Sequence, residues 1–328
     1  MDRLDINPRI ISALNRAQMT NLEKLICMSG TEIERRANIS STDASVLLKA
    51  VADLMISQPI IPALQLNKPE CPPCHRIPRL TCGCNVIDAF LRGGLLCRGI
   101  TEICGESATG KTQWCLQLCL SVQLPIQMKG LNAGAVYICT EDVFPNKRLM
   151  QMVGGAKLKY PDLKINWTDN IFIEHIAEIE DLDICITHRL PALLSQGRVK
   201  LVIIDSIAAL FRCEYGLKDM PKRAKLLSSF GAKLRSLSSK HGCAVVCVNQ
   251  VSAVMDPKGD NKGPRRSHIQ PALGISWSNL VTCRLMLSRN NSITAGPPQR
   301  NVSVVFAPHL PNMSCRYIIT NGGVKGIT

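Results

Sequence analysis

Residues 105–112, GESATGKT, carry the clearest chemistry in the sequence, because they fit the pattern G-x-x-x-x-G-K-[ST]. In such a loop, glycines let backbone N–H groups point at phosphate oxygens, and the lysine, here Lys111, reaches the outer phosphates. The Thr112 hydroxyl is suited to binding Mg²⁺. The sequence therefore predicts a nucleotide site, which we call the nucleotide loop. Its residues are Gly105, Glu106, Ser107, Ala108, Thr109, Gly110, Lys111 and Thr112.

Three polar residues that follow apolar runs fit the remaining parts of such a site. Asp205 comes after Leu-Val-Ile-Ile, and a buried carboxylate without a cation would be costly, so we expect it to face the metal ion. Glu141 is placed to orient and activate water, and Gln250 to sense the outermost phosphate. Solvated strand ends are the alternative interpretation of Glu141 and Gln250.

The elements that must position these residues alternate from about residue 80 onwards. Apolar runs rich in valine and isoleucine, separated by helical segments, are typical of a mainly parallel sheet covered by helices on both faces. The predicted strands are 100–104, 135–139, 171–174, 201–204 and 244–249, and the predicted helices are 111–123, 145–153, 179–195 and 221–241. Alternation at 302–306, and a turn after 316–320, predict an antiparallel extension. The fold class is therefore α/β.

Residues 1–56 are predicted to form short helices only. Asn7 precedes Pro8, which favours a helix start, and the spacing after Thr20 and Thr31 predicts two capping boxes. Gly30 is predicted to end the helix between them. Short helices joined by tight turns suit contacts with a DNA backbone and equally suit a bundle that binds protein, so both interpretations stay open.

A proline-bearing segment at 57–79 is predicted to link this helical domain to a core at 80–328, because proline interrupts helices. The segment contains Ile60-Ile61-Pro62-Ala63-Leu64. An extended apolar patch of this kind can add itself to the sheet of a neighbouring molecule.

The composition limits the classes of partner and the cellular environment that we expect for this protein. A formal net charge of +14 and a pI of about 9.2 favour a polyanion as partner, either nucleic acid or an acidic membrane surface, the alternative being a basic soluble protein without such a partner. No apolar run approaches the roughly 18 residues of a membrane span, and the charged N-terminus lacks an apolar signal region, so we expect neither membrane insertion nor secretion. Most of the 16 cysteines are expected to be reduced and buried. The pairs at 71–74 and 82–84 lack the further ligands of a zinc set.

In the order GESATGKT, YICTEDVFPNKRL, LVIIDSIAALFR and VNQV, the sequence resembles the RecA-type strand-exchange ATPases in their eukaryotic form. The resemblance covers nearly the whole chain and implies a RecA-like ATPase core behind a small helical domain. Stretches such as 134–142, 211–214 and 307–311 are closer to one paralogue of that family, which acts in homologous-recombination repair.

The resemblance implies roles for single residues. Glu141 matches the catalytic glutamate of the family, which acts together with the loop lysine, Lys111. Arg148 matches an arginine that packs near adenine. Gln250 matches the glutamine that couples the γ-phosphate to the DNA-binding loops, and Pro271 matches a proline that caps the nucleotide of a neighbouring subunit.

Assembly and DNA binding are also implied. Ile60 and Ala63 match the linker motif that docks on the next subunit, but the family recombinase has an aromatic residue where this chain has Ile60, which favours a dedicated partner over a long homofilament. The two DNA loops of the family fall at 214–223 and 256–270, where a solvated basic loop is the alternative interpretation. The expected phosphate contacts are Lys218, Lys222, Arg223, Lys258, Lys262, Arg265 and Arg266.

The resulting hypothesis is a DNA-dependent recombinase paralogue that binds ATP with Mg²⁺ and acts in a hetero-oligomer during double-strand-break repair. Its expected partners are single-stranded and branched DNA, a second recombinase paralogue and the main eukaryotic recombinase. Its expected location is the nucleus, with the cytoplasm as a second location. The alternatives are an adapter whose ATP site is structural, a hexameric helicase, and a small-molecule kinase.

Overall fold

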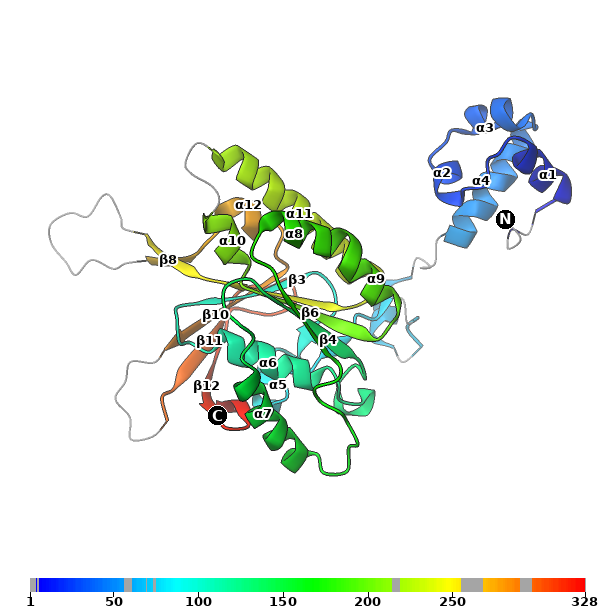
Figure 1. The fold of residues 1–328 in the computed structure, drawn as a ribbon. Helices are drawn as coiled ribbons and strands as arrows, with labels where there is room; N and C mark the ends of the chain where they lie inside the picture. The colour runs from blue at the N-terminus through cyan, green and yellow to red at the C-terminus, as the bar shows by residue number, and fades with distance from the viewer. Residues whose placement is uncertain are drawn as a thin grey trace. The chain divides into compact units, whose positions relative to one another are not determined.

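A computed structural model describes residues 4, 6–55, 61–68, 70–72, 75–213, 219–254, 268–289 and 297–327. The chain divides into two compact units, 1–76 and 77–328 (Figure 1). None of the helices in the described part is both long and apolar enough to cross a membrane.

The first unit consists of helices around a small apolar core that includes Leu14, Ile33 and Leu47. As predicted, the Asn7 side chain caps the first helix by accepting a hydrogen bond from the Arg9 N–H. The helices are α1 (Pro8–Arg16), α2 (Leu22–Ile26), α3 (Gly30–Ala37) and α4 (Ser41–Met55), followed by a 3-10 helix at Ala63–Asn67.

The predicted caps of the next two helices are wrong. Asn21 caps α2, where Thr20 was predicted, and Ser29 caps α3, where Thr31 was predicted. Because the Ser29 hydroxyl accepts the Glu32 N–H at 3.3 Å, α3 already begins at Gly30, which therefore starts a helix and does not end one.

The second unit is built on one sheet. In the described residues its strand order is β13-β12-β11-β10-β3-β7-β6-β4-β5. Neighbours are parallel from β10 to β5 and antiparallel from β13 to β10, so both the parallel sheet and its antiparallel extension are confirmed. The strands are β3 (Ile100–Gly105), β4 (Gly134–Cys139), β5 (Ile171–His175), β6 (Val199–Asp205), β7 (Ala244–Asn249), β10 (Cys283–Arg289), β11 (Arg300–Phe306), β12 (Ser314–Thr320) and β13 (Gly323–Ile327).

The described residues also form two short antiparallel pairs outside this sheet. β1 (Arg79–Leu80) pairs with β2 (Leu95–Leu96), and β8 (Val251–Val254) pairs with β9 (His268–Pro271). We call the second pair the β8–β9 ribbon.

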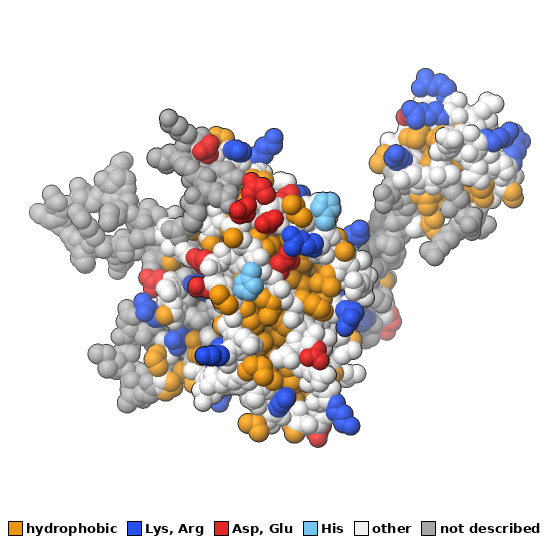
Figure 2. All heavy atoms as spheres, viewed as in Figure 1, with side chains coloured by type: hydrophobic (Ala, Val, Ile, Leu, Met, Phe, Trp, Pro, Cys, Tyr) orange, Lys and Arg blue, Asp and Glu red, His pale blue; other side chains and the backbone are white. Residues whose placement is uncertain are grey.

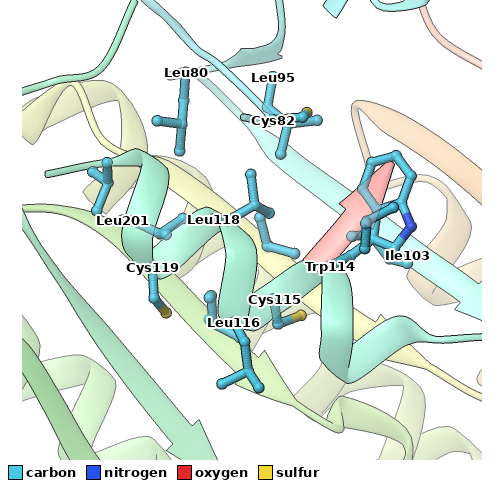
Figure 3. Packing of buried hydrophobic residues seen from close by; sticks show 14 of the residues in the cluster. Leu80, Cys82, Leu95, Ile103, Trp114, Cys115, Leu116, Leu118, Cys119 and Leu201 are labelled. Carbon is cyan, nitrogen blue, oxygen red and sulfur yellow. The ribbon is translucent and has the colours of Figure 1, made fainter. Parts of the chain in front are cut away.

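Helices cover both faces of the sheet, as predicted (Figure 1). One face carries α5 (Asn85–Phe90), α6 (Lys111–Ser121) and α7 (Asn146–Lys159), and the other carries α8 (Ile179–Ile184), α9 (Leu190–Ser195), α10 (Ile207–Cys213), α11 (Met220–His241) and α12 (Gly274–Ser278). Figure 3 shows Trp114 of α6 beside Ile103 of the sheet, and Leu118 of the same helix belongs to the same apolar cluster.

Two predicted helices differ in extent. The helix predicted at 145–153 continues to Lys159 as α7. The helix predicted at 179–195 is divided into α8 and α9 by a π-helical turn at Cys185–Arg189, just before Pro191, which has no N–H to continue regular α-helical bonding.

The cysteines lie mostly inside this unit, as expected. Among the described cysteines, Cys104 and Cys139 are typical: both are buried, and burial raises the pKa of each thiol to about 12. Such thiols stay protonated and act as small apolar side chains.

Candidate nucleotide-binding site

A cavity of about 1050 Å³ lies at the carboxyl ends of β3, β4, β6 and β7, and it brings the predicted site residues together. This volume suits a nucleotide-sized ligand. Within the nucleotide loop, Thr109 is fully buried, and its hydroxyl donates to the Glu106 carbonyl at 2.9 Å. The predicted residues that line the cavity are Gly105, Glu106, Ser107, Ala108, Gly110, Lys111, Thr112, Glu141, Arg148, Asp205 and Gln250.

Two glycines allow the nucleotide loop its shape. Gly110 has a φ of +101°, and a Cβ there would lie 2.6 Å from Ile319 Cδ1. A Cβ on Gly105 would lie 2.4 Å from the backbone oxygen of Leu287. Because α6 begins directly at Lys111, the free N–H groups of its first turn lie at the cavity and favour an anion there.

Lys111 is folded back onto the loop. Its ammonium group donates to the carbonyl oxygens of Gly105 at 2.8 Å and Glu106 at 2.9 Å. Burial lowers the pKa of Lys111, and the nearby carboxylates of Asp205 and Glu141 oppose that shift. The ammonium group therefore stands beside the loop and facing acidic groups, where phosphate oxygens could replace its carbonyl partners.

The position of Asp205 at the end of β6 fits the predicted metal site. Its Oδ2 accepts hydrogen bonds from the Thr112 hydroxyl at 3.0 Å and from the Tyr137 hydroxyl at 2.5 Å. Burial raises the pKa of Asp205, while these two bonds act in the opposite direction. A hydroxyl oxygen and a carboxylate oxygen side by side form a hard donor set that fits Mg²⁺.

Glu141 and Gln250 meet although β6 separates their strands in the sheet. The Gln250 amide donates to one carboxylate oxygen of Glu141, and the Ser206 hydroxyl donates to the other at 3.1 Å. Thr140 ties the end of β4 to the end of β6, since its N–H donates to the Asp205 carbonyl at 3.0 Å and its hydroxyl bonds to the Ser206 backbone. The general base predicted for water is thus joined directly to the predicted phosphate sensor.

Arg148 lies on α7 and connects three elements around the cavity. Its Nε donates to Gln113 Oε1 of α6 at 2.7 Å, and its Nη2 donates to the Thr320 carbonyl at the end of β12 at 2.6 Å. Arg148 thereby holds one wall of the cavity, where the sequence predicts contact with adenine.

Tyr137, Tyr317 and Arg300 support the site although the sequence assigned them no role. Tyr137 supports Asp205, Tyr317 donates from its hydroxyl to the Thr109 carbonyl at 2.7 Å, and Arg300 donates to the Ala108 carbonyl at 3.3 Å. Tyr137 could have been found from its place near the end of the strand that precedes Glu141. Tyr317 and Arg300 come from the antiparallel extension, and no local pattern connects them with the loop.

The remaining predicted residues lie elsewhere. Lys222 and Arg223, predicted in a DNA loop, belong to the first turn of α11, which begins at Met220 and accommodates Pro221 there. Ala63 is exposed in the 3-10 helix, and Pro271 ends β9 opposite Val251. The predictions for Ile60, Lys218, Lys258, Lys262, Arg265 and Arg266 fall outside the described residues.

Charge on the visible face of the molecule is uneven. Figure 2 shows acidic side chains gathered over α8, whose first turn carries Glu180 and Asp181. These acidic groups would repel a polyanion.

Comparisons with known proteins agree with this geometry. The Rad51 family model matches residues 74–327. The chain is 44% identical to the DNA repair protein XRCC3 of Bos taurus over 335 residues, which cover 100% of this chain and 98% of that protein. It is 42% identical to DNA repair protein XRCC3 of Mus musculus over 343 residues, covering 100% of this chain and 98% of that protein. It is 29% identical to DNA repair protein rhp57 of Schizosaccharomyces pombe over 357 residues, which cover 99% of this chain and 98% of that protein.

Proposed function

This chain belongs to the Rad51 family, and from that membership we propose that it is an ATP-binding recombinase paralogue that acts with DNA in homologous-recombination repair. The observation that carries the proposal is the meeting of Lys111, Thr112, Asp205, Glu141 and Gln250 around one cavity. Relatives described as DNA repair proteins over their full length support the repair process.

The residues of the cavity divide the work of ATP binding and turnover. Lys111 and the N–H groups at the start of α6 would hold the phosphates. Thr112 and Asp205 would hold Mg²⁺, which neutralises charge that develops on the phosphates when it is bound. Glu141 would take the proton of the attacking water, a task for a carboxylate that already accepts bonds from Gln250 and Ser206.

The proposed partners are single-stranded and branched DNA, a second recombinase paralogue and the main recombinase. β5 is the outer strand on its side of the sheet and Ile173 on it is 45% exposed, so a partner could add a strand there. The exposed 3-10 helix that contains Ala63 supports a second contact, through which this chain would dock on its neighbour. We place this work in the nucleus, with the cytoplasm as a second location.

ATP turnover by the purified full-length chain, with and without single-stranded DNA, tests the proposal. Glu141→Gln keeps the shape of the side chain but removes the base, so turnover should fall by about 10²–10⁴-fold while ATP still binds. Lys111→Ala should weaken ATP binding as well. Ser195→Ala, at the exposed end of α9, serves as the control variant.

A nucleotide-held adapter is the second candidate function. Two sets of hydrogen bonds favour it: those from Lys111 to the loop carbonyls and the one from Gln250 to Glu141. They stabilise the site without a turnover step. Tight ATP binding with no DNA-stimulated hydrolysis would support the adapter and overturn the ATPase.

A further inference from the structure

A buried carboxylate lies directly behind the nucleotide loop and has no part in the proposed chemistry. Glu102 is on β3, three residues before Gly105, and is 0% exposed. Ile100 packs in the core on the α11 side of the sheet and Ile103 in the core on the α6 side, so the alternation of the strand directs Glu102 to the α11 side. A charge buried there requires partners for all its acceptor sites.

Three elements supply these partners. Arg284, the cross-strand neighbour of Glu102 on β10, donates from its Nε to Glu102 Oε2. Glu102 Oε1 accepts from the Nδ2 of Asn249 at the end of β7 at 2.6 Å and from the indole Nε1 of Trp277 on α12 at 2.9 Å. Both side chains of the ion pair are almost completely buried, so water weakens these interactions little.

The same network reaches the base of the β8–β9 ribbon. The Nδ2 of Asn249 also donates to the Ala272 carbonyl at 2.9 Å, and the Ala272 N–H donates to the Gln250 carbonyl at 2.8 Å. Asn249 must turn its amide nitrogen toward Glu102 and Ala272, because both are acceptors. Ala272 follows the last residue of β9, and Gln250 precedes the first residue of β8, so both ends of the ribbon are held at one point.

We propose that Glu102 is a positioning residue that couples the nucleotide site to the β8–β9 ribbon. Gln250 has its side chain in the nucleotide cavity and its carbonyl in the base of the ribbon. Glu102 holds Asn249 in place, and Asn249 in turn holds Ala272, so the two ends of the ribbon keep a fixed position relative to each other. A change at the cavity that reaches Gln250 therefore moves both ends together. Without that anchor, the ribbon no longer follows the state of Gln250.

The inference rests on the proposed binding of ATP and DNA, and it deepens that proposal. The variant that tests it is Glu102→Gln, which keeps the size of the side chain and removes its charge. Trp277→Phe is a second variant, which keeps both charges of the ion pair and removes one donor to Glu102. The matched control is Ser238→Ala, which removes the hydrogen bond from a buried hydroxyl to the Cys243 carbonyl at 2.7 Å, at the end of α11.

The measurement is the affinity of the full-length chain for a fluorescent oligo-dT, in the presence of ATP and of ADP, with ATP affinity measured in parallel. Coupling between two ligand sites is typically about 5–150-fold, so we expect the ratio of the two DNA affinities to lie in that range for the parent chain and for Ser238→Ala. In Glu102→Gln we expect a ratio near one. The ATP affinity should stay within about twofold of the parent chain, because the residues proposed to hold ATP are unchanged.

Indole fluorescence gives a readout that a merely structural role would not move. The change in fluorescence on adding ATP is measured in the parent chain and in Trp277→Phe, and the difference between the two is the contribution of Trp277. We expect this contribution to disappear in Glu102→Gln.

An unchanged DNA-affinity ratio in Glu102→Gln, beside a coupled parent chain, would overturn this inference and leave the proposed function standing. A parent chain that binds DNA equally with ATP and ADP would also overturn the inference, and a parent chain that binds neither ATP nor DNA would overturn the proposed function as well. Should Glu102→Gln fail to fold, Trp277→Phe decides the matter: a reduced ratio supports the coupling, and an unchanged ratio overturns it.

Discussion

Removing Arg284 should test the energetic weight of the buried ion pair behind the nucleotide loop. Arg284 is 6% exposed and Glu102 is 0% exposed, so Arg284→Met fills similar space but leaves the carboxylate with only two uncharged donors, Asn249 and Trp277. Loss of one member of a buried pair costs about 3–5 kcal/mol. Arg284 also lies 4.9 Å from the ring centroid of Phe306, a cation–π contact that adds roughly 0.5–2 kcal/mol.

The expected loss can be read as a thermal midpoint. For a unit of this size, one kcal/mol corresponds to about 2–4 °C, so Arg284→Met should lower the midpoint of the second unit by roughly 6–20 °C from the ion pair alone. Urea unfolding followed by circular dichroism gives the same free energy independently.

The double variant Glu102→Gln/Arg284→Met separates charge from packing. It removes both charges, and a neutral replacement of a buried pair is often nearly neutral, so it should regain most of the lost stability. If Arg284→Met costs less than about 1 kcal/mol, or if the double variant is no more stable than the single one, the charge of Glu102 is not what Arg284 stabilises. That result would refute the reasoning.

Further predictions concern the cavity, the glycines and assembly. Burial raises the pKa of Asp205 above its ordinary value, so ionisation of Asp205 opposes folding. Asp205→Asn should therefore stabilise the nucleotide-free chain at pH values above that raised pKa. The gain should vanish below about pH 4, and urea midpoints measured against pH would show it. Gly323→Ala should cost about 1–3 kcal/mol in urea unfolding, because φ is +120° and the new Cβ would lie 2.2 Å from Gln117 Oε1. Gly154→Ala, in α7 with nothing near its Cβ, should instead add about 0.5–1 kcal/mol. Ala63→Glu should reduce co-purification with the partner paralogue and leave the thermal midpoint unchanged, since Ala63 is exposed; retained co-purification would exclude this contact.

The parts of the site that depend on local sequence were predictable. The nucleotide loop is a contiguous pattern, and Asp205 follows an apolar run whose burial directs it to the carboxyl edge of a parallel sheet. The parallel order of the strands then brings Glu141 and Gln250 to the same edge. None of these inferences requires knowledge of contacts between distant side chains.

Contacts between side chains far apart in the sequence were not predictable. Glu102 reads as one polar residue in an apolar strand, and its partners Arg284 and Trp277 come from elements that no pattern connects with it. The helix caps failed for a different reason. Ser29 and Thr31 are both capping residues within three positions, and only the folded backbone decides which one accepts the N–H.

The side chains that would handle the outer phosphates and the attacking water already have protein partners. Lys111 is bound to loop carbonyls, and Gln250 is bound to Glu141. Under the proposed function, Gln250 would donate from its amide to the outermost phosphate, and a turn of the side chain that loosens its bond to Glu141 would leave that carboxylate oxygen available to accept a proton from water. Release of the Glu141 carboxylate and movement of the end of the β8–β9 ribbon would then follow from one event. Both depend on Gln250, which bonds to Glu141 with its side chain and to the Ala272 N–H with its carbonyl.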